Sequence, residues 1–516
     1  MALRNPESGQ LTTDPVSQCR NMSNALLSMG GPLHFLPPPS EAFSSLIALS
    51  PICLSSLPLP PMDVDWFQQK LGQSKPDRAG VFDGTNLYLW SLAPPPIRTW
   101  LFQVCNLCLH KPMPPEWSTA IIHLLYKKGD PSSPVNYRPI SLLNSIYKVV
   151  ASHLCLYISQ ICAQHTLLHP CQYGGRRNFR TADHIYEIQA RRQLYGPAYH
   201  LYIDLNKAFN SIPHQALWDL LHYMGFHPTL ITAIQNLYQH PLDMPRVNGH
   251  TLHTHSQTRG LRQGCPLSPI LFNIYLNPLL FQVSGCLNPY PEASLHAFID
   301  DILIRSPCPH IIRSAFKRFI QGAEILGLSI NFDKTELHAL DGSPHLSLSF
   351  SPFPPLSAYI PGTLPPRTSY KYLGVWFFNS SQATALVDYI QREITSYFHN
   401  LSVLPLSPGE IILLVNRQLI PILLYRMLAH PLNTPQLDII QKMIWTKLAK
   451  ACHIPLSTSP KDTFHAKSKG GLGLKCFRLS LACQDFNYFS RFWLSQGPPS
   501  ANQQVKSVMG AQTASP

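Results

Sequence analysis

The sequence predicts an α+β protein. Segments with helical spacing and short apolar runs typical of strands follow one another along the chain, but without the regular alternation that produces a doubly wound parallel sheet. The 516 residues correspond to two to four compact units, at about 100–200 residues per domain.

The first 61 residues are rich in Ser, Pro and Leu and show no clean periodicity. The proline cluster Pro37 to Pro39 cannot continue a helix. We therefore expect residues 1–61 to form a linker or a poorly ordered lead-in. From about residue 64 the pattern changes.

Apolar periodicity predicts the later elements in order. Helical spacing around Leu101 to Cys108 precedes a strand at 119–126 (TAIIHLLY) and a turn at KKGDPSSP. The elements expected after it are a helix at 141–163, a strand at 199–205, helices at 214–224 and 267–282, a strand–turn–strand at 294–306, a helix at 311–326, a proline-rich loop at 351–367, the strand-like YKYLGVWFF, and helices at 382–398, 409–428 and 434–450.

The charge is unevenly distributed. Lys and Arg number 40 against 27 Asp and Glu, and two stretches account for the whole excess of 13: 110–215 carries +6 and 441–480 carries +7. Two basic patches on a neutral body favour a polyanionic partner, nucleic acid before membrane. Two solvated faces are the alternative.

The sequence disfavours a secreted, a membrane-spanning and a zinc-binding protein. Thirteen cysteines, an odd number, and no charged-then-apolar leader at Met1 favour reduced thiols in an intracellular protein over a secreted disulfide framework. Prolines interrupt the uncharged run 42–62, and Arg417 interrupts the apolar run from Ile411, so we expect no membrane span. Cys105 and Cys108 lack a second pair and should face a helix core rather than bind zinc.

Asp300 and Asp301 form an acidic pair inside the apolar stretch HAFIDDILIRS. Adjacent carboxylates repel each other and lose hydration in such surroundings, a cost that a cation would compensate. Oxygen ligands favour Mg²⁺ or Mn²⁺ over zinc. An exposed hairpin turn, where Asp is common, would explain the pair equally well.

Asp204 closes the strand-like run YHLYIDL, 96 residues before the pair. Across a sheet it could meet Asp300 and Asp301 and supply a third ligand for two ions. Such a site activates an attacking hydroxyl and stabilises in-line displacement at phosphorus. The alternative role of Asp204 is an ordinary helix cap.

Seven blocks now point to a family. WSTAIIHLLYKKGDPSSPVNYRPISLLNSIYKVVA, QYGGRRNFRTADHIYEI, HLYIDLNKAFNSIPH, RGLRQGCPLSPILFNIYLNPL, HAFIDDILI, LGLSINFDKTEL and YKYLGVWF occur in series over about residues 62–480. Their order and spacing resemble the reverse transcriptase of non-LTR retrotransposons, the long interspersed elements.

The resemblance implies a right-handed polymerase with fingers, a palm of ferredoxin-like topology and a helical thumb. Fingers and palm would occupy residues 62–375, the thumb 376–484, and a disordered tail 485–516. It implies an intracellular protein, expected in the nucleus, that extends the 3′-hydroxyl of a DNA primer with dNTPs on an RNA template by two-metal catalysis.

The resemblance also assigns residues by position. The metal-binding catalytic triad would be Asp204, Asp300 and Asp301, with the carbonyl of Leu205 as an additional ligand. Lys334 stands at the place of the lysine proposed to protonate the leaving pyrophosphate. Phe209, five residues after Asp204, would exclude ribonucleotides by crowding the sugar 2′-position.

The remaining assignments concern nucleotide and primer. Gln263 and Gly264 would lie under the incoming nucleotide and the template base, and Tyr372, Leu373 and Gly374 would form the primer grip. The groups on the triphosphate would be Lys127, Lys128 and Arg138, a fork plus point charges.

Simpler interpretations remain open for some of these residues. Lys127 and Lys128 could belong to a solvated turn, and Gln263 to an ordinary loop. Phe209 could be a core aromatic, and Lys334 could lie on a helix surface. The family usually has a second Asp at Asn210.

The basic stretch 441–480 should track duplex phosphates. At about 100° per residue, Lys442, Lys447 and Lys450 fall within about 60° of one another on a helix. A solvated helix face is the alternative.

About 60 residues precede the fingers and about 35 follow the thumb, so we expect neither an endonuclease nor an RNase H domain in this chain. Two other hypotheses remain. A decayed or domesticated copy would bind RNA or an RNA–DNA hybrid without catalysis, and an intron-encoded maturase would need a further helical domain.

Overall fold

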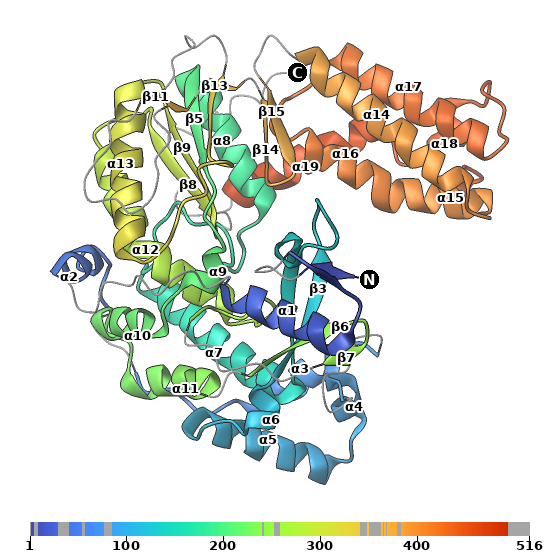
Figure 1. Cartoon of the computed structure of the whole chain (residues 1–516). Coiled ribbons are helices and arrows are strands. Elements are labelled where there is room, and N and C mark those ends of the chain that lie inside the picture. Colours follow the sequence, from blue (N-terminus) through green and yellow to red (C-terminus); the bar gives the residue numbers. More distant parts are fainter. Residues whose placement is uncertain are drawn as a thin grey trace. The chain divides into compact units, whose positions relative to one another are not determined.

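The computed structural model describes residues 2–4, 9–28, 41–53, 57–76, 85–239, 242–251, 259–340, 348–349, 363–364, 366–367, 369–378 and 383–493. The chain divides into two compact units. Figure 1 labels their helices and strands. The first unit comprises residues 1–177, 205–285 and 317–331, and the second comprises 178–204, 286–316 and 332–516.

The first unit contains a four-stranded sheet in the order β4-β3-β6-β7. β3 (Ala120–Tyr126) and β4 (Tyr137–Leu143) pair antiparallel along their whole length, and β6 (Asp243–Val247) lies parallel to the start of β3. The other elements of this unit are β1 (Leu3–Arg4), β2 (Leu11–Thr12), α1 (Pro15–Ser28), α2 (Glu41–Ile47), α3 (Val64–Gly72), α4 (Leu87–Leu92), α5 (Pro95–His110), α6 (Pro115–Ser118), η1 (Pro134–Asn136), α7 (Ser145–Gln164), α9 (Ala208–Ser211), α10 (His214–Tyr223), α11 (Pro228–Tyr238) and β7 (His250–Thr251).

The expected lead-in was wrong for residues 15–28, which form helix α1. Cys19, Met22 and Ala25 are fully buried on it, and α1 packs against β6. Polar Gln18 and Asn21 are buried as well. Because the buried face mixes polar and small residues with apolar ones, its helical period is hidden in the sequence.

Within the described parts of the chain, two helices are long and apolar enough to cross a membrane: α7, and α12 (Ser268–Leu287), which continues into a segment of the other unit. The protein itself buries 56% and 78% of their most apolar 18 residues. A helix that is apolar on all sides is typical of a protein core as well as of a membrane. These helices are therefore weak indications of membrane insertion. The expected helix at 141–163 begins only at Ser145, because residues 141–143 continue β4.

The second unit is built on a five-stranded sheet in the order β13-β10-β5-β9-β8. β5 (Ala198–Ile203) pairs antiparallel with both β9 (Asp301–Ser306) and β10 (Glu336–Leu340), and β8 (Ser294–Phe298) pairs antiparallel with β9. β13 (Pro366–Arg367) runs parallel to β10 at one edge. Helix α13 (Pro309–Ile325) begins in this unit. Mixed sheets and helices without regular alternation confirm the predicted α+β class.

One face of this sheet is covered by helix α8 (Thr181–Tyr195) and by the hairpin of β14 (Ser369–Tyr372) and β15 (Val375–Phe378). Ile185 and Ile188 of α8 belong to one buried cluster with Tyr202 of β5 and Tyr372 and Phe377 of the hairpin. The covering layer thus packs directly on the strand that leads to Asp204. The short strands β11 (Leu348–Ser349) and β12 (Thr363–Leu364) form a separate pair.

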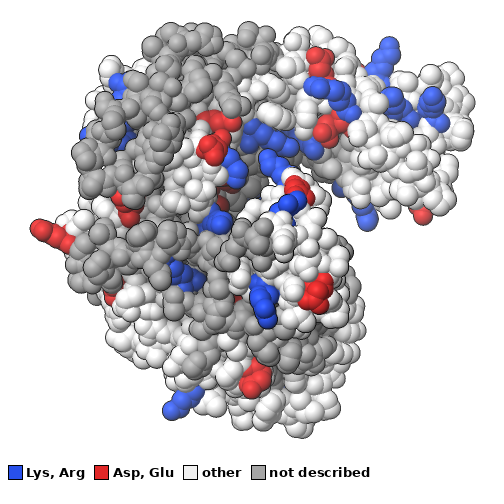
Figure 2. All heavy atoms as spheres, in the orientation of Figure 1, with Lys and Arg blue, Asp and Glu red and all other residues white. Residues whose placement is uncertain are grey.

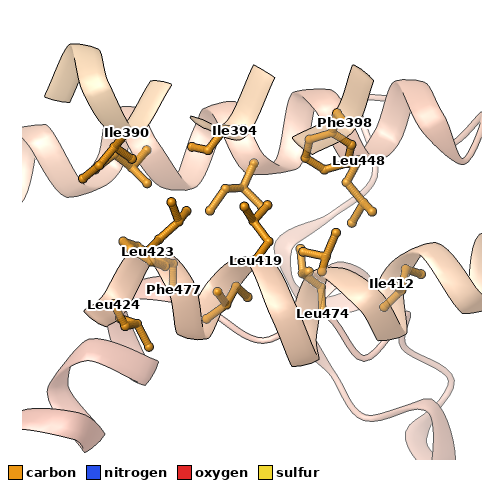
Figure 3. Close-up of a cluster of buried hydrophobic side chains, with 14 of the residues drawn as sticks. Ile390, Ile394, Phe398, Ile412, Leu419, Leu423, Leu424, Leu448, Leu474 and Phe477 are labelled. Carbon is orange, nitrogen blue, oxygen red and sulfur yellow. The ribbon is translucent and has the colours of Figure 1, made fainter. Parts of the chain in front are cut away.

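The C-terminal residues form a helical bundle, called here the C-terminal bundle (α14–α19). Its bounds are α14 (Ala383–Ser402), α15 (Pro408–Leu414), a π-helical turn (Val415–Leu419), α16 (Ile420–Arg426), α17 (Thr434–Ala451), α18 (Pro460–Phe464), η4 (Lys467–Lys469) and α19 (Phe477–Trp493). Aliphatic and aromatic side chains of these helices, among them Ile390, Ile394, Leu423 and Phe477, interdigitate in its core (Figure 3).

The predicted helix at 409–428 is interrupted by the π-helical turn that precedes Pro421. Proline lacks the amide hydrogen and collides with the carbonyl four residues earlier in a regular helix, and a wider turn relieves that collision. The predicted disordered tail begins too early, since α19 continues to Trp493. Most of the predicted loop 351–367 and the tail beyond 493 lie outside the described residues.

Candidate active site

The acidic residues lie at one edge of the five-stranded sheet. Ile203 of β5 is opposite Ile302 of the adjacent strand β9. Because the strands are antiparallel, Asp204, which follows β5, and Asp301, which begins β9, leave the sheet at the same end. The fold thus brings together two carboxylates that are 97 residues apart in the chain.

Asp300 lies in the tight turn between β8 and β9. Phe298 pairs with Asp301, so only Ile299 and Asp300 form the loop. Ile299 has a φ of +61°, a left-handed conformation that a β-branched residue rarely adopts. Such conformations persist only where the surroundings fix them, and they cluster at functional sites. The turn supports the prediction that this hairpin presents the acidic pair.

The carboxylates influence one another. The pKa of Asp301 is raised to about 7, first by desolvation and then by the negative charges of Asp300 and Asp204. Lys334 Nζ lies 3.6 Å from Asp204 Oδ2, and the backbone N–H of Asp204 donates to Thr335 Oγ1 at 3.3 Å. The structure therefore places four predicted catalytic residues, Asp204, Asp300, Asp301 and Lys334, in the same unit.

The donor set is chemically suited to a hard divalent cation, because it consists of carboxylate oxygens whose mutual repulsion a cation would relieve. No three His, Cys, Asp or Glu side chains are arranged as a preformed metal cluster in the described part of the chain. Leu205, whose carbonyl was predicted as a further ligand, is buried and forms an isolated bridge with Ile330 in the first unit.

The predicted triphosphate groups lie on the β3–β4 hairpin of the first unit. Arg138 is opposite Leu125 in the ladder, and the N–H of Lys127 bonds to Asn136 O at 2.9 Å beyond the last paired residues. Lys127, Lys128 and Arg138 are exposed. Three cations on one exposed hairpin are compatible with an anionic ligand and also with a solvated turn.

The loop of Gln263 and Gly264 is anchored to the same hairpin. The N–H of Ser141 on β4 donates to Gln263 O at 2.7 Å. Gly264 has a φ of +117°, and a Cβ on it would lie 2.7 Å from Ser141 O. Only glycine fits this position without displacing backbone.

Phe209 is half-buried and stacks on Phe272 of α12, with ring centroids 4.8 Å apart and an interplanar angle of 16°. Its carbonyl accepts from Leu261 N–H at 2.7 Å, and Gln263 Nε2 donates to Asn210 Oδ1 at 3.3 Å. Phe209 and Gln263 are thus held beside each other in the first unit. The amide of Asn210 serves as the acceptor at the position where the family usually has Asp.

The predicted primer grip is the turn of the β14–β15 hairpin. Leu373 and Gly374 have φ values of +47° and +83°, as a two-residue type I′ turn requires. Gly374 is exposed, whereas Tyr372 is 3% exposed. Tyr425 of α16 donates its hydroxyl to Leu373 O at 2.7 Å.

The predicted duplex-binding lysines all lie on α17 in the C-terminal bundle. Lys442 and Lys450 are exposed and Lys447 is half-buried. Lys447 and Lys450 line a cavity of about 490 Å³ together with His399 and His453. Figure 2 shows basic side chains over the helices of this bundle on the face drawn.

Sequence reasoning missed residues that the fold brings to these positions. Phe272 stacks on Phe209, which lies 63 residues earlier in the chain. Tyr425 bonds to the turn residue Leu373, which lies 52 residues earlier. Lys207 lies near Lys127 and has a lowered pKa, mainly through desolvation and then through the charge of Lys127. Only Lys207, two residues before Phe209, could have been noticed from its place in the motif.

Comparison with known protein families indicates the class of protein to which the central segment belongs. A family model described as reverse transcriptase (RNA-dependent DNA polymerase) matches residues 126–377, which include every predicted residue of the carboxylate, nucleotide and primer sites. This segment is therefore a reverse transcriptase domain.

Individual relatives indicate the kind of genetic element from which similar reverse transcriptases come. The retrovirus-related Pol polyprotein from type-1 retrotransposable element R2 of Popillia japonica is 25% identical over 388 residues, 72% of this chain and 52% of that protein. The probable RNA-directed DNA polymerase from transposon X-element of Drosophila melanogaster is 26% identical over 284 residues, 51% of this chain and 29% of that protein. The Transposon TX1 uncharacterized 149 kDa protein of Xenopus laevis is 31% identical over 199 residues, which are 36% of this chain and 15% of that protein.

The reverse transcriptase domain and these relatives together support a reverse transcriptase of the non-LTR retrotransposon type. The chain spans about half the length of the Popillia polyprotein and less of the other two relatives.

Proposed function

We propose that this chain is an RNA-directed DNA polymerase that extends a DNA primer on an RNA template with dNTPs. The proposal rests chiefly on Asp204, which follows β5, and Asp301, which begins β9, because both lie at one edge of the sheet. Desolvation, and then the charges of Asp300 and Asp204, raise the pKa of Asp301. Carboxylates gathered in this way suit phosphoryl transfer assisted by divalent cations.

In this proposal the five-stranded sheet and its covering layer are the palm, the β3–β4 hairpin belongs to the fingers, and the C-terminal bundle is the thumb. Asp204, Asp300, Asp301 and the carbonyl of Leu205 would hold two Mg²⁺ or Mn²⁺ ions. When bound, these ions would lower the pKa of the primer hydroxyl and neutralise charge on the phosphates.

The side chains of the chain itself then have separate tasks. Lys127, Lys128 and Arg138 bind the triphosphate oxygens, and Phe209, supported by Phe272, blocks space for a 2′-hydroxyl. Lys334, 3.6 Å from Asp204, donates a proton to the departing pyrophosphate.

Nucleic acid would be held by two further groups. Gln263 and Gly264 support the template base, and the exposed lysines of α17 contact duplex phosphates without regard to sequence. The two basic stretches of the chain supply the charge that such a polyanion needs.

Primer extension tests this function. Purified protein is incubated with a DNA primer annealed to RNA, the four dNTPs and Mg²⁺ or Mn²⁺, and products are separated by length. We expect template-dependent extension that requires the metal and stops when Asp204 is changed to Asn. Tight binding of the hybrid without any extension would instead favour the decayed or domesticated copy.

A further inference from the structure

The buried position of Tyr372 does not fit direct contact with a primer. Its ring packs inside the layer that covers the sheet, with centroids 5.2 Å from Tyr202 and 6.4 Å from Phe377. The hydroxyl donates to the backbone carbonyl of Asp301 at 3.0 Å and lies 3.0 Å from His184 Nε2. Thus the polar end of Tyr372 is directed at the carboxylate hairpin.

Counting protons orients this chain of hydrogen bonds. A phenol has one hydrogen, and the Asp301 carbonyl can only accept, so the Tyr372 hydrogen is directed to Asp301. His184 Nε2 must then donate to the Tyr372 oxygen. His184 is fully buried, and burial lowers its pKa to about 3, so the ring stays neutral. The arrangement His184 to Tyr372 to Asp301 is therefore a fixed support.

The same hairpin is also held at its turn. Leu373, the next residue, accepts the Tyr425 hydroxyl from α16 at 2.7 Å. Two successive residues of the hairpin are thus hydrogen-bonded to different partners. Tyr372 is joined to the hairpin of the acidic pair, and Leu373 is joined to the C-terminal bundle.

We propose that Tyr372 is a positioning residue that fixes the backbone of Asp301, and that it does not contact the primer. This proposal rests on the proposed polymerase function. A carbonyl and a carboxylate on one residue move together, so removal of the hydroxyl bond displaces the carboxylate. A shift of about 1 Å at a reacting centre can reduce the rate by about 100-fold. Loss of the Tyr372 hydrogen bond alone frees Asp301 only in part, so we expect a smaller decrease in rate.

The test replaces Tyr372 by Phe, which keeps the ring and removes the hydroxyl. We expect kcat for primer extension to fall about 10-fold while the Kd for the RNA–DNA hybrid stays within about 2-fold. Manganese binding, followed by electron paramagnetic resonance without substrate, should weaken as well. Tyr397→Phe is the matched control, since its hydroxyl donates to Gln418 within the bundle at 3.1 Å.

His184 variants separate positioning from packing. His184→Gln keeps an N–H donor for Tyr372 and should preserve most of kcat, whereas His184→Leu should lower it as Tyr372→Phe does. In the Tyr372→Phe background both His184 changes should have little additional effect on kcat, because the supported bond is already absent.

Several outcomes would overturn the proposal. An unchanged kcat and unchanged manganese affinity in Tyr372→Phe would do so, as would a change confined to hybrid Kd, which would make Tyr372 a primer contact. If wild-type protein does not extend primers, the polymerase function fails, but the manganese comparison between wild type and Tyr372→Phe still decides the role of the hydroxyl.

Discussion

At the scale of single residues, the left-handed Ile299 is the most informative conformation at the carboxylate site. A two-residue turn with a β-branched residue at φ +61° is costly in itself. It leaves Asp300 in the loop and Asp301 on the strand, so both carboxylates stay at the sheet edge. The turn thereby sets the position of both acidic side chains.

Replacing Asp300 by Asn should therefore abolish catalysis without unfolding the protein. The change removes a charge in a turn and no buried apolar contact. We expect primer extension to fall by at least about 100-fold, with hybrid binding and the thermal unfolding midpoint nearly unchanged. Asp388→Asn, an exposed acid on α14, is the control. Full activity of the Asp300 variant would exclude its role as a metal ligand.

Replacing Phe209 by Ala should raise ribonucleotide incorporation, since the smaller side chain leaves room for a 2′-hydroxyl. The ratio of kcat/KM for a dNTP over its ribonucleotide counterpart should fall by about 10-fold or more. Phe272→Leu should lower the ratio less, because it removes only the stacked support. Phe281→Leu on the same helix is the control. If the ratio stays constant in the Phe209 variant, Phe209 is a core aromatic and no more.

At the scale of elements, α17 shows how helix geometry gathers charges. Lys442, Lys447 and Lys450 lie on one helix, as the spacing predicts, but the fold leaves Lys447 half-buried beside a cavity. The interpretation as a duplex-binding face therefore depends mainly on the two exposed lysines.

Changing these three lysines to Gln should weaken binding to all hybrid sequences alike. Removing one lysine–phosphate interaction should flatten the plot of log K against log salt by about 0.7 to 0.9, so we expect a decrease of about 2 in slope for the triple variant. Fluorescence titrations at several salt concentrations measure it. Gln at Arg20, Lys70 and Lys75 removes equal charge outside both basic stretches and is the control. An equal slope in the α17 variant and wild type would favour a solvated face.

At the scale of the whole molecule, the sheet of the second unit has an unusually polar covered face. His200 and His338 are direct neighbours across β5 and β10, and His296 lies on β8. These rings and His184 are at most 1% exposed. A buried neutral imidazole stabilises the fold only while it stays unprotonated.

The stability of the second unit should accordingly decrease below about pH 6.5, the ordinary histidine pKa. Burial holds the pKa values of His184, His200 and His296 well below that value. The unfolded chain binds protons that the folded state does not bind. Each of these histidines therefore lowers the unfolding free energy by about 1.4 kcal/mol for every pH unit below that point. Urea unfolding at a series of pH values from neutral into the mildly acidic range measures the decrease.

Two variants make this measurement specific. His296→Gln should reduce the pH dependence of the unfolding free energy, whereas His310→Gln, at an exposed position of α13, should leave it unchanged. Constant unfolding free energy across this range in the wild-type protein would show that the buried rings do not govern acid stability.

The sequence by itself determined the family and most elements. Seven motif blocks in series identify a reverse transcriptase, and strong apolar periodicity located the strands that carry Asp204 and Asp301, because local pattern and tertiary burial agree there. It failed at α1, where the buried face contains polar residues, and at the tail, where α19 continues past residue 485.

Only the tertiary structure decided which partners support the predicted residues. Phe272 behind Phe209, Tyr425 at Leu373, and His184 and Tyr372 beneath Asp301 are contacts between elements far apart in the chain. A motif specifies the residue type at a position, but it carries no information about its distant neighbours. The direction of a side chain such as Tyr372 depends on strand pairing and packing, which the folded chain alone establishes.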